Sequence, residues 1–372
     1  MHTDLDPERS RSGSFRSIRQ FPRPRRSVAS RNVPRTFPHP RNDVTATSYE
    51  LARCAVCASA ESDEIVSVDD AKEEIEMLWE YHSRRLDPAV PAEHLMDRVA
   101  FSQRAPLRLV RCYDCGLVYR NPVERPTELA QIYEAEGPAE NVLRTLHHTQ
   151  RPAYDAQAAR LTEIFGRRGT GIEVGSYVGG FLAAARDAGW QFAGVDVNAE
   201  TNAFTRSLGF QVFDGTIESL DPERRVDVVA IWNCLDQLPD PASAVRAARS
   251  HLTSGGMLAI RVPNGACYAA FRPLLRSPFG AIAREWLAQN NLLGFPYRYG
   301  FTPTAVTRLV ERNGMRVEQV YGDVLVPIAD RWTKRWAALE ERLVKRVIGA
   351  GAKMSSGDKP LAPWFEVYAK VE

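Results

Sequence analysis

The sequence has few long apolar runs and little net charge, and these shortages exclude several classes of protein. No run approaches the roughly 18 apolar residues that a membrane-spanning helix needs. The charged N-terminus is not followed by an apolar segment, so no secretory signal is predicted. The formal net charge is +2, and apolar residues make up 44% of the 372 residues, as in globular proteins. We therefore expect a cytoplasmic globular protein that is long enough for two domains.

Cysteine is also scarce, with six residues, but four of them form two C-x-x-C pairs. The first pair is Cys54 and Cys57, and the second is Cys112 and Cys115. Without a secretory signal, such pairs indicate a metal site in a reducing compartment rather than disulfides. Four thiolates suit a closed, tetrahedral, structural site, so we predict that these residues bind zinc.

Composition divides the chain into four segments. Residues 1–45 contain ten arginines, four acidic residues and few aliphatic residues, which predicts a disordered leader rich in Arg, Pro and Ser. A second interpretation of this basic leader, as an arm that binds nucleic acid or a membrane, stays open. Residues 46–122 contain the cysteine pairs with a helical insertion between them, and residues 123–165 favour a helical lid. In the remaining segment, 166–372, residues 264–300 interrupt the regular pattern and are predicted to be a substrate loop.

From residue 171 onward, short apolar runs alternate with alanine-rich helical segments. This alternation predicts an α/β fold in which helices cover a parallel sheet. The predicted strands are Gly171–Val174, Phe192–Val195, Phe210–Phe213, Asp227–Trp232, Met257–Val262, Val317–Val326 and Trp364–Val371.

A glycine-rich turn follows the first of these predicted strands. Gly175 and Gly179 let the backbone approach a ligand closely. Asp196 ends the next strand, where its carboxylate can accept both hydroxyls of a ribose. Tyr177 stands where a dinucleotide-binding turn has its second glycine, and Glu173 would oppose a pyrophosphate. The pattern therefore favours an adenosine ligand that carries positive charge, such as S-adenosylmethionine (SAM).

With these residues, the C-terminal part of the chain resembles the class I SAM-dependent methyltransferases. The resemblance extends over residues 160–326 and includes the final strand. It implies a Rossmann-like sheet of seven strands, mostly parallel with the last strand antiparallel, and SAM as the cofactor. The residues that the resemblance assigns to the cofactor are Glu173, Gly175, Ser176, Tyr177, Gly179, Asp196, Val197, Asp214, Gly215 and Asn233.

The segment Arg111–Tyr119, followed by Asn121 and Pro122, is similar to the N-terminal zinc-binding module of many bacterial small-molecule methyltransferases. Some of those relatives methylate carbon atoms of nucleotide-linked deoxysugars, and they carry a Glu-His pair in the loop after the fifth strand. That pair is absent here, where the loop reads Phe295–Phe301. The resemblance therefore implies a zinc ribbon but does not supply this base.

Methyl transfer requires that the acceptor is aligned and, where necessary, deprotonated. His147 and His148 precede the cofactor domain, where a lid helix would pass, and we consider them candidate bases. Tyr297 and Tyr299 are candidates for lining the acceptor pocket. Relatives often carry histidines after the fourth strand, but asparagine and glutamine stand there in this chain. No general base is therefore expected from that loop.

These observations predict a bacterial SAM-dependent methyltransferase (EC 2.1.1) that acts on a small-molecule acceptor, free or linked to a carrier or nucleotide, in a biosynthetic pathway. One alternative is an RNA methyltransferase that uses the ribbon and the basic leader. Because the rest of the chain is mildly acidic, nucleic acid is the less favoured partner. The sequence also leaves open a SAM-binding protein without catalysis and a nicotinamide-dependent oxidoreductase. The oligomeric state is not predicted.

Overall fold

The described residues belong to one compact unit within Thr36–Glu372. The computed structural model describes residues 49–87, 89, 107–125, 139–290, 292–293, 297–325, 333–354 and 361–372. The predicted leader, residues 1–45, lies outside these ranges, as do residues 126–138 of the predicted lid. None of the described helices is long and apolar enough to cross a membrane.

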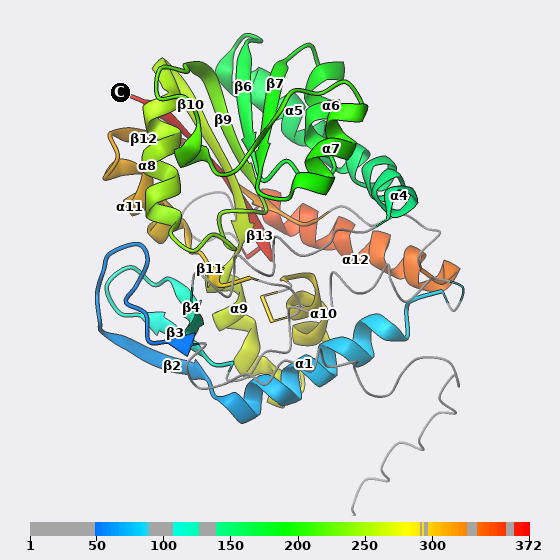
Figure 1. The fold of residues 1–372 in the computed structure, drawn as a ribbon. Helices are drawn as coiled ribbons and strands as arrows, with labels where there is room; N and C mark the ends of the chain where they lie inside the picture. The colour runs from blue at the N-terminus through cyan, green and yellow to red at the C-terminus, as the bar shows by residue number, and fades with distance from the viewer. Residues whose placement is uncertain are drawn as a thin grey trace, which may run out of the picture. The chain divides into compact units, whose positions relative to one another are not determined.

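A sheet of seven strands forms the centre of the larger domain (Figure 1). Its strands are β6 (Thr170–Val174), β7 (Gln191–Asp196), β8 (Val212–Asp214), β9 (Val226–Trp232), β10 (Leu252–Pro263), β12 (Met315–Asp323) and β13 (Trp364–Val371). They are arranged in the order β12-β13-β10-β9-β6-β7-β8. β13 runs antiparallel to both of its neighbours, whereas the other pairs are parallel. The predicted α/β sheet, mostly parallel with its last strand antiparallel, is therefore confirmed.

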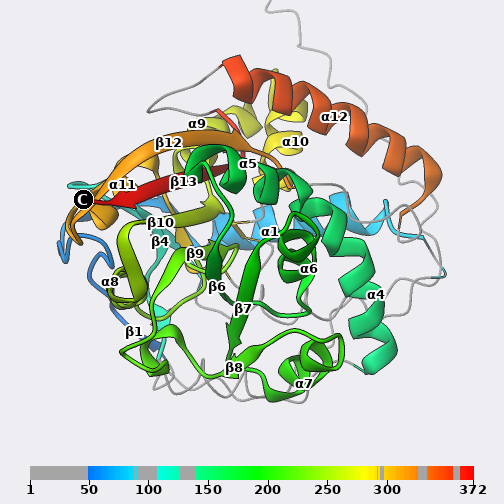
Figure 2. The same cartoon turned by 90° about the horizontal axis from the view of Figure 1, so that it is seen from above.

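Helices cover both faces of this sheet (Figure 1). They are α4 (Glu140–Gln150), η2 (Arg151–Tyr154), α5 (Asp155–Phe165), α6 (Gly180–Asp187), α7 (Ala199–Ser207), η3 (Ile217–Ser219), α8 (Pro241–His251), α11 (Pro303–Glu311) and α12 (Arg335–Met354). Residues along β9 alternate between the faces, as a strand covered on both sides requires. Val229 and Ile231 pack with α8 and α11, whereas Val228 and Ala230 pack with α5 and α6. α12 lies along the outer edge of the domain (Figure 2).

The cysteine-containing module has a second sheet, to which a distant part of the chain contributes a strand. Its strands are β2 (Ser62–Val66), β3 (Leu109–Cys112), β4 (Val118–Arg120) and β11 (Tyr299–Gly300), in the order β11-β4-β3-β2. Helix α1 (Val68–Ser83) follows β2, and β1 (Tyr49–Glu50) pairs with β5 (Val123–Glu124). Because β11 pairs antiparallel with β4, the segment after β10 is joined to the ribbon through main-chain hydrogen bonds.

The segment between β10 and α11, predicted to be a substrate loop, packs against α1. Before β11 it forms α9 (Gly265–Phe271), η4 (Arg272–Arg276) and α10 (Gly280–Asn290). The Tyr81 hydroxyl donates a hydrogen bond to Glu285 at 2.6 Å, and the Tyr268 hydroxyl donates to Glu74 at 2.5 Å. Arg272 binds Glu74 at 2.6 Å. The described part of this segment is therefore packed against the cysteine-containing module through hydrogen bonds and an ion pair.

Charged side chains are buried where β10, β12 and β13 meet. Arg261 on β10 is buried, and its Nη1 lies 3.3 Å from Asp323 Oδ2 at the end of β12. Glu366 on β13 is fully buried and binds Arg160 of α5 at 2.5 Å. Buried charges are tolerated only with partners, so these ion pairs hold three strands and a helix in one arrangement.

Candidate cofactor site and metal centre

The turn after β6 brings its backbone against the loop after β9. Gly175 has a φ of 72°, and a Cβ atom at this position would lie 2.6 Å from Cys234 Sγ. Gly179 has a φ of 70° and caps α6, while Ser176 is buried beneath the turn. Tyr177 has a φ of 44°, which is uncommon for a residue that has a side chain. Such strained backbone often marks a ligand site, as the sequence predicts for this turn.

Asp196 ends β7 and holds the glycine-rich turn in place. Its carboxylate accepts hydrogen bonds from the backbone amides of Tyr177 and Asn198, each at 3.0 Å. Its backbone oxygen accepts from the Gly215 amide at 2.9 Å, which brings the end of β8 beside it. Burial raises the pKa of Asp196, and the backbone amides partly oppose this shift. These residues lie at the carboxyl edge of the sheet, where open α/β folds bind their ligands.

Two further residues predicted to bind the cofactor flank Asp196 and are more exposed. Val197 directly follows it and is exposed although its side chain is apolar. Asp214 ends β8, where it binds Arg206 at 2.7 Å and accepts a hydrogen bond from Asn202 at 2.8 Å. The hydrogen bond from Arg206 lowers the pKa of Asp214 and keeps the carboxyl group ionised. An apolar surface beside an acceptor of hydrogen bonds suits a purine base.

Three carboxyl groups act on Cys234 from the carboxyl ends of β6, β7 and β9; two of them are buried, and that of Asp196 is partly buried. Burial raises the pKa of the Cys234 thiol, and the charges of Asp196, Asp236 and Glu173 raise it further. Burial also raises the pKa of each of these three carboxyl groups. For Glu173 the charge of Asp196 adds to the increase, and Arg261 opposes it. Because a cation would stabilise the ionised forms, the cluster favours a ligand that carries positive charge.

Asp236 is a candidate that the sequence analysis missed. Its side chain is fully buried, and no other described residue donates a hydrogen bond to either carboxylate oxygen. Its backbone oxygen accepts from the amides of Arg298 at 2.8 Å and Tyr299 at 3.1 Å. Asn233, at the start of the same loop, directs Oδ1 toward Arg261 Nε at 2.8 Å. This loop, for which the sequence predicts no base, therefore contains a buried carboxyl group, and such a group is costly without a proton or a ligand.

The two candidate histidines lie on α4 beside the glycine-rich turn. His147 Nδ1 is 2.7 Å from the carbonyl oxygen of Val178, so this nitrogen carries the proton that it donates. The His147 ring contacts the edges of Phe204 and His148, with centroids 6.4 Å and 5.7 Å away. Burial lowers the pKa of His147 and so favours its neutral form. The structure therefore places His147 against the predicted cofactor turn, whereas His148 is exposed and contacts the ring of His147.

The two candidate tyrosines have different surroundings. Tyr297 is buried, with its ring against the edge of Trp364 at a centroid distance of 5.5 Å. The Tyr299 hydroxyl donates to the backbone oxygen of Pro239 at 3.2 Å. Tyr299 also lines a cavity of about 280 Å³ between the ribbon and the loop after β9. The structure thus brings Tyr299 to the same loop as Asp236 and packs Tyr297 in the core.

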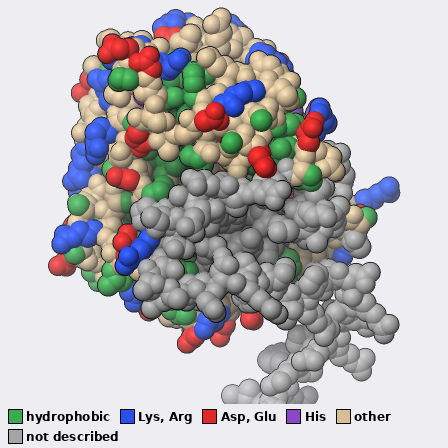
Figure 3. All heavy atoms as spheres, viewed as in Figure 1, with side chains coloured by type: hydrophobic (Ala, Val, Ile, Leu, Met, Phe, Trp, Pro, Cys, Tyr) green, Lys and Arg blue, Asp and Glu red, His purple; other side chains and the backbone are tan. Residues whose placement is uncertain are grey.

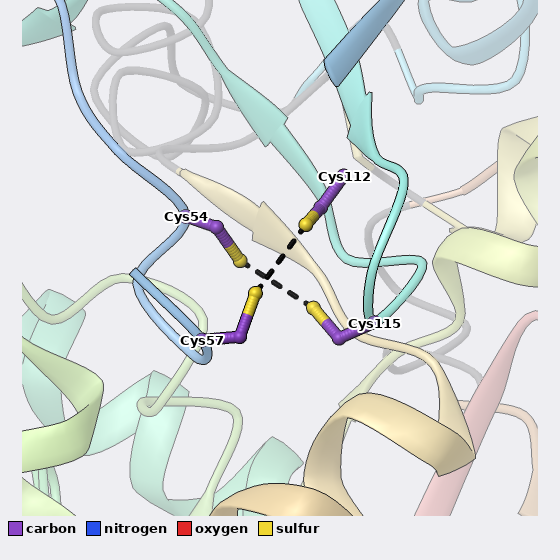
Figure 4. Close-up of side chains that lie close together, drawn as sticks. All are labelled: Cys54, Cys57, Cys112 and Cys115. Atoms are coloured by element: carbon purple, nitrogen blue, oxygen red, sulfur yellow. Dashed lines mark hydrogen bonds between the residues drawn. The ribbon is translucent and has the colours of Figure 1, made fainter. Parts of the chain in front are cut away.

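The four predicted zinc ligands come together although the pairs lie far apart in the sequence (Figure 4). The Sγ atoms of Cys54 and Cys115 are 3.4 Å apart, and those of Cys57 and Cys112 are 3.5 Å apart. All four sulfur atoms lie within 4.8 Å of one another. Zn–S bonds of about 2.3 Å in a tetrahedron place sulfur atoms about 3.8 Å apart, so this set fits one zinc ion. The hydrogen bond between Cys54 and Cys115 is the main cause that lowers the pKa of Cys54 to about 5 and raises the pKa of Cys115, so within this pair Cys54 is the thiol that favours the thiolate form that metals bind.

Helix α11 joins this cysteine cluster to the larger domain. The Thr302 hydroxyl donates a hydrogen bond to the backbone oxygen of Cys115 at 3.2 Å. The same Oγ1 accepts from the Ala305 amide at 3.1 Å and caps the helix. Arg312 at the other end of α11 donates to the backbone oxygen of Val56 at 2.9 Å. The helix therefore contacts both cysteine-containing turns.

Comparisons with known proteins find methyltransferases among the sequences similar to this chain. Residues 146–320 match the family described as a methyltransferase domain, from within α4 to within β12. Among curated proteins, the chain is similar to the ubiquinone biosynthesis O-methyltransferase of Nitrobacter winogradskyi, with 25% identity over 187 residues, or 48% of this chain and 68% of the relative.

Two solved structures are also similar to this chain. One is a SAM-dependent methyltransferase from Thermotoga maritima, with 15% identity, a TM-score of 0.44, and coverage of 66% of this chain and 100% of the other. The second is the CcbJ methyltransferase of Streptomyces caelestis, with 16% identity, a TM-score of 0.40, and coverage of 65% and 96%.

Proposed function

We propose that this protein transfers the methyl group of SAM to a small-molecule acceptor, because residues 146–320 match the family described as a methyltransferase domain. The observation that supports SAM most strongly is the group of carboxyl groups around Cys234, which consists of the buried Glu173 and Asp236 and the partly buried Asp196, beside a tight glycine turn. SAM carries a sulfonium and an ammonium group, which these carboxylates attract. The pyrophosphate of a nicotinamide cofactor would be repelled by the same charges.

Five of the residues predicted to bind the cofactor have a defined role in this proposal. Asp196 accepts hydrogen bonds from the ribose hydroxyls, and Glu173 attracts the ammonium group. Gly175 allows the backbone to approach the ligand closely. Asp214 binds the edge of the adenine base, and the exposed Val197 side chain packs on its face.

We assign to Asp236 the role of the base that takes up the proton of the acceptor. SAM supplies an electrophilic methyl group, so the protein has to align the acceptor and take up the proton that it loses. A carboxylate with a raised pKa is a stronger base than an ordinary aspartate, and burial raises the pKa of Asp236 well above its usual value. His147 and His148 remain candidate bases on the lid helix, and Tyr299 is a candidate for positioning the acceptor.

We also propose that Cys54, Cys57, Cys112 and Cys115 hold a structural zinc ion. Four sulfur ligands complete a tetrahedral site and leave no open position for an acceptor or a water molecule. The zinc ion would therefore fix the ribbon and, through Thr302, the start of α11.

A small-molecule acceptor is favoured over RNA for two reasons. The relative from Nitrobacter winogradskyi is named as an O-methyltransferase of ubiquinone biosynthesis, which is a small-molecule pathway. On the face shown in Figure 3, acidic and basic side chains are interspersed over the described residues, whereas RNA binding requires a basic surface.

The acceptor class can be tested with SAM that carries a tritiated methyl group. The full chain is incubated with a bacterial small-molecule extract or with purified total RNA. We expect label in the small-molecule fraction that depends on active protein. Label that enters only RNA would overturn the acceptor class, and label that enters neither fraction would count against catalysis.

Asp196→Ala is expected to weaken SAM binding by about tenfold to a hundredfold, because hydrogen bonds to a charged group contribute about 1.5–3 kcal/mol. Isothermal titration calorimetry with SAM, S-adenosylhomocysteine and NAD measures this effect. Asp221→Ala, on the exposed turn before β9, is the matched control and should bind SAM like the unchanged chain. Preferential binding of NAD, or equal SAM affinity in both variants, would contradict the proposed cofactor site.

Asp236→Asn is expected to lower the rate of methyl transfer by about 10² to 10⁴ while SAM affinity stays the same, as for loss of a general base. A purely structural role would leave this rate unchanged once the protein is folded.

The same substitution also tests the raised pKa of Asp236. Because the pKa of Asp236 is higher in the folded chain, its ionisation destabilises the fold as pH rises. Asp236→Asn should therefore gain stability over the unchanged chain between mildly acidic and neutral pH, measured by urea unfolding.

A further inference from the structure

The outward face of α12 has no role in the proposed methyl transfer, and its inward face accounts for how the helix is held. Ala337, Ala338 and Ile348 are buried against the domain. Glu340 binds the buried Arg85 at 2.7 Å, which ties α12 to the end of α1. The helix is therefore fixed in place, and its other face is available to a partner.

Four large apolar side chains lie on that outward face. Trp336, Leu339, Leu343 and Val347 are 50%, 69%, 62% and 58% exposed. Their spacing of three, four and four residues puts them on one stripe of an α-helix, about 16 Å long at 1.5 Å per residue. An exposed apolar stripe of this length on a well-packed helix indicates an interaction surface.

The charges on the same face all have one sign. Arg335, Arg342 and Arg346 are the exposed charged residues of α12 among its described side chains. Each of these arginines stands directly before an apolar residue of the stripe. The two acidic residues of the helix, Glu340 and Glu341, are partly buried. Glu340 binds Arg85 outside the helix, and Glu341 pairs with the buried Lys345 one turn further along α12.

We propose that this face of α12 binds an anionic lipid bilayer, with the helix lying in the plane of the membrane surface. Exposed apolar side chains that alternate with arginines are the pattern of interfacial helices, in which the apolar groups enter the headgroup region and the cations contact lipid phosphates. Because, among the described side chains of α12, only one stripe is both apolar and exposed, the association would be peripheral.

Other occupants of this face are less favourable on electrostatic grounds. The N-terminal leader has ten arginines against four acidic residues, so it would bring positive charge against positive charge. A second copy of the chain would place the arginines of two identical helices against each other. The surface is also a convex helix face, which fits a plane better than an inserted peptide.

Vesicle co-sedimentation of the full chain tests the proposal, with phosphatidylcholine vesicles that contain or lack phosphatidylglycerol. The unchanged chain should bind the anionic vesicles preferentially, and added salt should weaken the binding. Arg335→Glu combined with Arg346→Glu should reduce partitioning at least about tenfold, since each basic residue contributes about 1 kcal/mol at an anionic surface. Leu339→Gln combined with Leu343→Gln should reduce it without a change of charge.

Arg168→Glu combined with Arg225→Glu is the matched control, because it makes the same change of charge on exposed loops that lead into β6 and β9. This control should retain most of the binding. The leader is present in every variant, so it cannot produce a difference between them. Equal partitioning of the α12 variants and the control, or equal binding to neutral and anionic vesicles, would overturn the proposal. Circular dichroism melts would confirm that the compared variants are folded.

Discussion

Cys112→Ser is expected to release zinc and to unfold the ribbon module. Structural zinc ions contribute roughly 10–16 kcal/mol of binding free energy to small domains, and most of this is lost when a ligand is removed. The variant should contain much less than equimolar zinc by plasma emission spectrometry. Amide hydrogens of β3 and β4 should exchange much faster than in the unchanged chain. Chelation of the unchanged chain should produce the same pattern.

Cys267→Ser is a suitable control for this prediction. Cys267 is buried outside the cluster, and its thiol donates to the backbone oxygen of Leu361 at 3.3 Å, a bond that a hydroxyl group can also form. This variant should keep equimolar zinc and its protected ribbon. Full zinc content in Cys112→Ser, or protected ribbon amides after complete chelation, would show that the cysteine cluster is not a structural zinc site.

Arg261→Leu is expected to destabilise the chain by about 3–5 kcal/mol, because it leaves buried carboxyl groups without their cation. Burial is the main cause that raises the pKa of Asp323 to about 6, and Glu366 adds to the increase. A carboxyl group with a raised folded-state pKa favours folding when protonated and opposes it as pH rises through that value. The loss in the free energy of unfolding caused by Arg261→Leu should therefore be largest above about pH 6 and smaller at lower pH.

Arg316→Leu provides the comparison, since Arg316 also pairs with a carboxylate, Glu318, but is exposed on β12. An exposed ion pair contributes about 0–1 kcal/mol, so this variant should unfold at nearly the same urea concentration as the unchanged chain. Urea unfolding of both variants across pH measures the difference. Similar, small effects of the two substitutions would mean that the buried ion pairs do not stabilise the sheet as described.

The sheet could be predicted because its signal is local. Residues 226–232 of β9 form an apolar run between turns, and the resemblance to the methyltransferases supplied the antiparallel direction of the last strand. The grouping of the four cysteines could also be predicted, because two C-x-x-C pairs have the spacing of the ligands of one tetrahedral metal site. The roles of the residues assigned to cofactor and catalysis stay predictions.

Two features could not be predicted because they depend on tertiary contacts. β11 has only two residues, Tyr299 and Gly300, and two residues have no periodicity; β4 alone makes them a strand. Asp236 lies in the loop after a strand, which is a common position for an aspartate and by itself indicates no function. Its side chain is buried, and its backbone oxygen accepts from the amides of Arg298 and Tyr299, which come from a distant part of the chain. The burial of this carboxyl group and its raised pKa therefore follow from the tertiary fold and could not be predicted from the sequence.

The pairing of β11 with β4 has a consequence for how such a protein can be recombined. A ribbon transplanted from a relative, or a catalytic domain moved without its ribbon, would break a sheet whose strands come from both parts. Each half would then expose an unpaired strand edge, which invites aggregation. Chimeras with a junction between the ribbon and the lid should fail, whereas chimeras that exchange the ribbon together with the segment between β10 and α11 should fold. The ribbon and the segment between β10 and α11 therefore have to be exchanged together, although more than a hundred residues separate β4 from β11 along the chain.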